Sequence, residues 1–151
     1  MCRNRVRLAV RAAAAFVFLA AALPAASTMK MVVAELPLPA DDKPVLLSGL
    51  SYDTMAWHGR VEAIRLKAVP AEGAKKVTWL VRASNSRGSR MRIDVDLHLL
   101  GADAKRLASG RKTLLLGAAT SGVEYGIDVE LGADLWKAAR SLRVEVRFIS
   151  N

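Results

Sequence analysis

Hydrophobic and polar residues alternate along most of the chain beyond residue 45. The alternation is clearest in residues 76–83 (KVTWLVRA), 123–131 (VEYGIDVEL) and 142–148 (LRVEVRF). Side chains of a β-strand point alternately to its two faces, whereas one face of a helix repeats every three to four residues. The pattern therefore predicts half-buried strands, and it places Trp79 in the core.

The alternation changes phase within residues 60–69. Val61 and Ala63 share one face, and the apolar set then continues through Ile64 and Leu66. One extra residue in the strand restores the register, so we expect a β-bulge near Ala63.

Turn-forming residues separate the predicted strands. They are concentrated in residues 84–89 (SNSRGS), 101–105 (GADAK) and 117–122 (GAATSG). A short helix capped by Asp134 is expected to place Trp136 over a sheet edge. About seven strands at this spacing predict an all-β fold, an antiparallel β-sandwich of immunoglobulin or fibronectin-III type, with a small barrel as the alternative. The sandwich domain is assigned to residues 45–151, and the Pro-containing residues 28–44 to a linker or edge segment.

The first 27 residues have the composition of a signal peptide. Four arginines precede an apolar run, and Pro24 and small residues follow it. We expect cleavage after Ser27 and an exported protein, periplasmic or extracellular. The alternative is an uncleaved anchor, but the apolar run falls short of the roughly 20 residues that a membrane span needs.

Cleavage would change the charge and the cysteine content. The formal net charge would fall from +9 to +5, with basic and acidic residues interspersed. This is not the clustered charge of a nucleic-acid-binding protein. The single cysteine, Cys2, would leave with the signal, which excludes a disulfide and a Cys-ligated metal. We expect no cofactor, no nucleic-acid partner and no membrane span after cleavage.

The stretch RIDVDLHLL (residues 92–100) carries Asp94, Asp96 and His98 at alternate positions. Side chains two apart on a strand are separated by about 6.8 Å, so only Asp96 and His98 are candidates to share a metal ion. The competing interpretation is a solvated sheet face whose carboxylates pair with arginines on neighbouring strands.

The stretch SYDTMAWHGR (residues 51–60) contains the best candidates for a binding loop. Tyr52, Asp53, Trp57 and His58 combine aromatic surface with polar groups, as partner-binding and sugar-binding loops do. The alternative is that Trp57 packs at the end of the sandwich.

A weak resemblance supports the predicted fold. Residues 81–107 (VRASNSRGSRMRIDVDLHLLGADAKRL) resemble the centre of small bacterial immunoglobulin-like accessory domains of the FxLyD kind. Asn85, Ser86 and Leu99 match that pattern. Leu97, Leu100 and Gly101 stand where the family has Phe, Tyr and Asp. The resemblance covers less than a third of the cleaved chain and carries no site residues to this sequence.

No catalytic set of residues is recognisable in the sequence. The chain has two histidines, and it lacks a Gly-x-Ser-x-Gly turn and phosphate-binding glycine loops. We therefore expect no enzyme but an exported binding or assembly domain, which recognises a protein partner through its end loops or an edge strand. A cell-envelope carbohydrate-binding module and a metal-binding protein using Asp96 and His98 are the alternatives.

Overall fold

The computed structural model describes residues 28–39, 43–47, 49–53, 58–67, 72–73 and 75–150. The expected signal peptide and Trp57 lie outside these residues. The described elements are β1 (Thr28–Pro37), β2 (Val45–Leu46), β3 (Ser51–Asp53), β4 (His58–Leu66), β5 (Lys76–Asn85), β6 (Met91–Leu100), β7 (Arg106–Leu116), β8 (Thr120–Glu130), α1 (Ala133–Ala138) and β9 (Ser141–Ser150).

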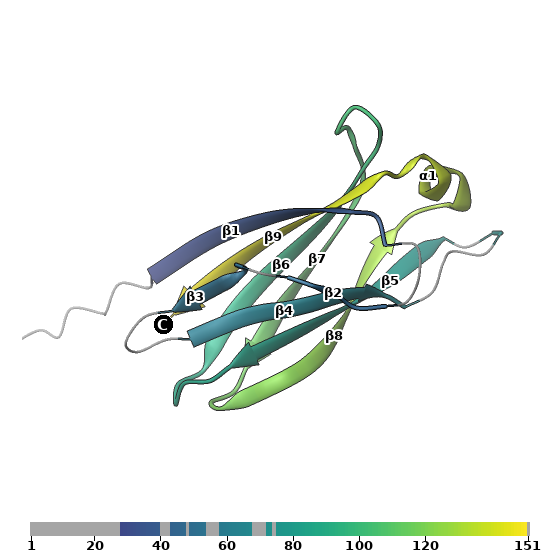
Figure 1. Cartoon of the computed structure of the whole chain (residues 1–151). Coiled ribbons are helices and arrows are strands. Elements are labelled where there is room, and N and C mark those ends of the chain that lie inside the picture. Colours follow the sequence, from purple (N-terminus) through teal and green to yellow (C-terminus); the bar gives the residue numbers. More distant parts are fainter. Residues whose placement is uncertain are drawn as a thin grey trace, which may run out of the picture.

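The strands form two antiparallel sheets that enclose one core, so the chain has an all-β, sandwich-like architecture (Figure 1). One sheet has four strands in the order β1-β9-β6-β7. The other has five, in the order β2-β4-β5-β8, with β3 also pairing with β4. The alternating residues that the sequence assigns to the inside do fill the core. Trp79, Ile93, Leu97, Val144 and Phe148 are all fully buried, as expected from their phase in each strand.

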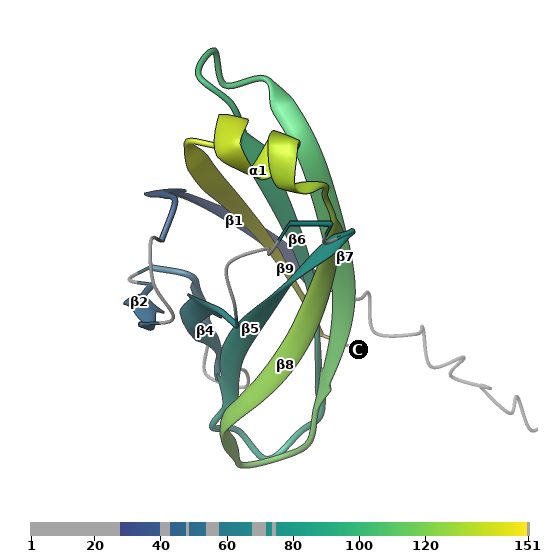
Figure 2. The same ribbon diagram turned by 90° about the vertical axis from the view of Figure 1, so that its right-hand side faces the viewer.

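Strands β7 and β8 close one side of the sandwich, where they run side by side (Figure 2). The approach is close at Gly110, where a Cβ atom would overlap the carbonyl oxygen of Asp128 and lie 2.9 Å from Cγ2 of Val129. Lys112 follows on the same face and donates a 2.9 Å hydrogen bond to the carbonyl oxygen of Gly126. Glycine is therefore required where β7 crosses β8.

The structure contains more strand than the sequence pattern predicts: nine strands within the described residues instead of about seven. Residues 28–37, assigned to a linker or edge segment, form β1 and pair with β9 along their full length. This strand is the edge of the four-stranded sheet, so the sheet includes described residues ahead of Val45.

Two local predictions have different outcomes. The register between β4 and β5 shifts between Val61 and Ala63, which confirms the predicted bulge. The predicted cap of α1 is wrong: Gly132 occupies the N-cap position, and Asp134 lies in the first turn without capping it. From this helix Trp136 packs on the core, its ring 6.2 Å from that of Trp79. Among the described residues, no helix has the length and apolar character needed to cross a membrane.

Candidate functional site

Three segments that are distant in the sequence meet at the end of the sandwich opposite α1 (Figure 1). The first is the β3–β4 hairpin, in which Asp53 pairs directly with His58. The second is the connection from β5 to β6 at residues 86–90, and the third is the turn from β7 to β8 at residues 117–119. Antiparallel pairing of β4, β5 and β8 brings these connections to the same end.

Asn85 holds two of these segments together. Its side chain is fully buried, and Nδ2 donates hydrogen bonds to the carbonyl oxygens of Ser89 at 2.7 Å and Gly117 at 2.9 Å. Oδ1 accepts a hydrogen bond of 3.2 Å from the backbone N–H of Arg87. One amide group thus satisfies three backbone groups, which fixes the two turns relative to each other.

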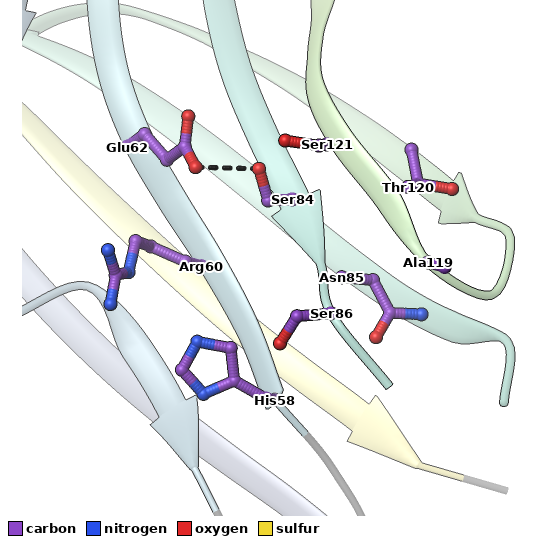
Figure 3. A pocket seen from close by; sticks show the side chains of 9 residues that line it. All are labelled: His58, Arg60, Glu62, Ser84, Asn85, Ser86, Ala119, Thr120 and Ser121. Carbon is purple, nitrogen blue, oxygen red and sulfur yellow. Dashed lines mark hydrogen bonds between the residues drawn. The ribbon is translucent and has the colours of Figure 1, made fainter. Parts of the chain in front are cut away.

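A pocket of about 370 Å³ lies between these segments, on the outer face of the five-stranded sheet. Figure 3 shows the side chains that line it, and we call it the hairpin-end pocket. Its lining consists of His58, Arg60, Glu62, Ser84, Asn85, Ser86, Ala119, Thr120 and Ser121. Eight of these nine residues have polar side chains. The volume falls within the range of small-molecule sites, roughly 300–1,000 Å³.

Both carboxylates at the pocket are neutralised by neighbouring groups. Glu62 accepts a 2.6 Å hydrogen bond from Ser84 and lies 3.3 Å from Nε of Arg82. On the rim, Oδ1 of Asp53 lies 3.1 Å from Nδ1 of His58 and 3.9 Å from the guanidinium group of Arg87. The contact to Asp53 places the Nδ1 edge of the His58 ring against the carboxylate.

Other polar groups of the pocket have no partner within the described part of the chain. The exposed Arg60 makes no ion pair or side-chain hydrogen bond there, and neither do the hydroxyl groups of Ser86 and Ser121. Ser84 and Thr120 differ, since Ser84 also accepts from the N–H of Gly122 and Thr120 donates to the carbonyl of Gly117. The pocket therefore offers one cation and two hydroxyl groups to a ligand.

The structure separates the residues that the sequence grouped as one binding loop. Asp53 and His58 lie together on the outer face, and His58 lines the pocket. Tyr52 belongs to the opposite face, where its ring lies 6.2 Å from that of Phe148 and 5.8 Å from Nζ of Lys30. Alternation along β3 explains the division, because neighbouring residues of a strand point to opposite faces.

Asp94 and Asp96 occupy the outer face of the four-stranded sheet, as the strand pattern predicts, but they are not solvated. Their exposed fractions are 8% and 5%. Asp96 accepts hydrogen bonds from Arg111 on β7 and Arg147 on β9. Asp94 accepts them from Arg92 at 2.9 and 3.0 Å and from Thr113 at 2.7 Å. The arginine side chains shield the two carboxylates from water.

Burial raises the pKa of Asp94, but the hydrogen bonds from Arg92 and Thr113 and the charges of Arg92 and Arg147 outweigh it. The net result is a pKa of Asp94 below its ordinary value. This carboxylate therefore stays ionised at neutral pH.

The arginines also occupy the oxygens that a metal ion would need. Both oxygens of Asp96 accept hydrogen bonds from guanidinium groups, and Nε2 of His98 lies 3.8 Å from Glu145. No group of three or more histidine, cysteine, aspartate or glutamate side chains is arranged to hold a metal ion within the described ranges. A metal at Asp96 and His98 would first have to displace two guanidinium groups.

Sequence reasoning missed most of the hairpin-end pocket. Arg60 and Glu62 stand on the polar face of the predicted strand at residues 60–69, and Ser86 and Ser121 stand in predicted turns. Nothing local distinguishes them from other surface residues, because the pocket arises only when β4, β5 and β8 pair.

A scan against protein-family models and a search of curated proteins both find no match for this chain.

Proposed function

We propose that this protein is an exported, non-catalytic binding domain that recognises a carbohydrate of the cell envelope in the hairpin-end pocket. The observation that carries the proposal is a pocket of about 370 Å³ whose lining is polar, with Arg60, Ser86 and Ser121 unpaired among the described residues. Sugars are recognised through many hydroxyl groups, and such groups match a wall of hydroxyl, imidazole and guanidinium partners.

The arrangement at the pocket favours binding over catalysis. Asp53 and His58 form the carboxylate–imidazole pair found in hydrolase triads. A triad also needs a nucleophile hydrogen-bonded to the imidazole. Figure 3 shows Ser86 on the His58 side of the pocket, but no hydroxyl group of the described residues donates a side-chain hydrogen bond to His58.

We also propose that the fold is an immunoglobulin or fibronectin-III type of sandwich and that the protein is exported. An immunoglobulin or fibronectin-III type of sandwich is supported by two antiparallel sheets, by the three connections that meet at one end and by the Asn85-Ser86 turn of the FxLyD resemblance. Export is supported by the signal-like composition of residues 1–27.

Cosedimentation with insoluble peptidoglycan tests the proposed function. We expect the wild-type protein to pellet with the polymer, and the double variant Ser86→Ala/Ser121→Ala to pellet at least several-fold less. Ser109→Ala is the matched control, because Ser109 is exposed on β7 and lies outside the pocket. Wild-type protein that stays in the supernatant with peptidoglycan and with other envelope polysaccharides would contradict the proposal.

A protein partner bound along β1 is the second candidate function. This edge strand of ten residues exposes Met29, Met31 and Val33 by 64%, 60% and 41%. An apolar edge strand is a template for an added strand. Crosslinking from β1 should capture a partner protein. We expect Met31→Glu to abolish this capture. Leu135→Glu, an exposed position on α1, is the control and should still capture the partner. Equal capture by both variants would count against this surface.

A further inference from the structure

We propose that the ligand of the hairpin-end pocket is an acidic sugar, a hexose or amino-hexose that carries a carboxylate, and that Arg60 binds this carboxylate. The inference rests on the proposed function and narrows it from carbohydrates in general to one chemical class.

The charges around the pocket leave one cation uncompensated. Glu62 is paired with Arg82 at 3.3 Å, and Asp53 with Arg87 at 3.9 Å. Arg60 has no acidic partner among the described residues, although it lies on the same face of β4 as Glu62. An exposed arginine by itself does not indicate a binding site. Arg60, however, lines a pocket whose carboxylates are already paired, so it attracts a ligand with a single negative charge.

The form of the cation favours a carboxylate. A guanidinium group presents parallel N–H donors that match the two oxygens of a carboxylate. Phosphate sites commonly add a helix N-terminus or a nest of backbone N–H groups. The short helix α1 lies at the opposite end of the sandwich and contributes no donor here (Figure 1).

The remaining free groups favour a sugar over an acidic peptide. Ser86 and Ser121 present hydroxyl groups that both donate and accept, as sugar hydroxyl groups do. Ser86 lies in the β5–β6 connection and Ser121 on β8 (Figure 3). Anchoring sites for peptides are usually rich in aromatic and apolar side chains. Ala119 is the one apolar residue in the lining of this pocket.

Matched sugar pairs test the inference by NMR titration of the exported protein. In glucuronate against glucose and galacturonate against galactose, a carboxylate replaces the hydroxymethyl group. N-acetylmuramate differs from N-acetylglucosamine by a lactyl ether that carries the carboxylate. We expect at least one acidic member to bind about tenfold more tightly than its neutral counterpart, with shifts at residues 58–62, 84–86 and 119–121. Arg60→Gln should remove this preference and leave the neutral sugar unchanged. Arg106→Gln, an exposed arginine outside the pocket, is the matched control and should keep the preference.

The outcomes separate the inference from the proposed function. Equal binding of acidic and neutral sugars at these residues, or a preference that survives Arg60→Gln, overturns the acidic-sugar inference and leaves carbohydrate binding intact. No binding of any sugar or of their oligomers overturns both. Acetate, or a peptide of aspartate and glutamate residues, that binds as tightly as the best acidic sugar overturns the assignment to a sugar. A folded state of Arg60→Gln is verified from its thermal unfolding.

Discussion

The side-chain amide of Asn85 donates a 2.9 Å hydrogen bond to the carbonyl oxygen of Gly117, 32 residues further along the chain. Because the same amide binds Ser89 and Arg87, this side chain connects the β5–β6 loop to the β7–β8 turn. We therefore expect both the stability of the fold and ligand binding at this end of the sandwich to depend on the Asn85 side chain.

We expect Asn85→Ala to lower the free energy of unfolding by about 2–3 kcal/mol, since buried backbone groups would lose their hydrogen bonds. Denaturant unfolding measures the change. Ser86→Ala, next in sequence but exposed, is the control and should change stability little. If Asn85→Ala lowered the free energy of unfolding no more than Ser86→Ala does, water would have to replace the hydrogen bonds of the Asn85 amide.

Gly110 should tolerate no side chain. Gly110→Ala places a Cβ against the backbone of β8 at Asp128, so β7 and β8 must separate. We expect a loss of about 2 kcal/mol or more, in the range for overpacking. Gly126→Ala is the control on β8, because its Cβ would lie 3.6 Å from Thr78, an ordinary contact. Equal unfolding midpoints for the two variants would contradict the close crossing.

Asp96 should be coupled more strongly to Arg147 than to Arg111. The side chain of Arg147 is 27% exposed and that of Arg111 is 66% exposed, so water screens the second pair more. Double-mutant cycles with Asp96→Asn, Arg147→Gln and Arg111→Gln measure both couplings. We expect about 1–2 kcal/mol for Asp96 with Arg147 and a smaller value for Asp96 with Arg111. The reverse order would show that exposure does not control these interactions.

Acid should weaken the fold through carboxylates with lowered pKa values. In addition to Asp94, hydrogen bonds from Arg65 lower the pKa of Glu124, and those from Thr78 and Lys76 lower the pKa of Asp128. A carboxyl group whose pKa is lower in the folded state stabilises above its unfolded pKa, about 4, and loses this contribution as the pH falls through its folded pKa.

The stability difference between wild type and Asp94→Asn should therefore be largest near pH 7 and shrink below about pH 4. Urea unfolding at pH 7, 5, 4 and 3 measures it. Asp103→Asn, in the exposed β6–β7 turn, should show no such trend. A difference for Asp94→Asn that stays constant from pH 7 to pH 3 would contradict the assignment.

The strands could be predicted from the sequence because alternation is a local property. Trp79 and Val81 are buried where the pattern places them, and the bulge at Ala63 follows from a change of phase in one segment. Strand β7 was harder to recognise, since Gly110 and Lys112 occupy inward positions in its middle. Inward positions of a strand are usually apolar, but these two residues face β8 at the closed side of the sandwich and are not apolar.

The site could not be predicted because it depends on which strands pair. The sequence shows that Asp96 shares a face with His98, but not that β7 and β9 flank them with Arg111 and Arg147. The burial of Asp94 and Asp96 likewise follows from long arginine side chains: Arg92 on the same strand covers Asp94, and Arg111 and Arg147 on the neighbouring strands cover Asp96. The same holds for the hairpin-end pocket, whose residues come from three strands and two turns.

The pairing of β1 with β9 also determines when folding can finish. Thr28 is the register partner of Ser150, and β9 is the strand that connects β1 to β6. A chain that emerges N-terminus first holds β1 without a partner until its last ten strand residues arrive. Contacts of such large sequence separation are formed slowly, so the four-stranded sheet is completed only after β9 has emerged from the ribosome. During this interval the unpaired edge of β1 is open to pairing with other chains.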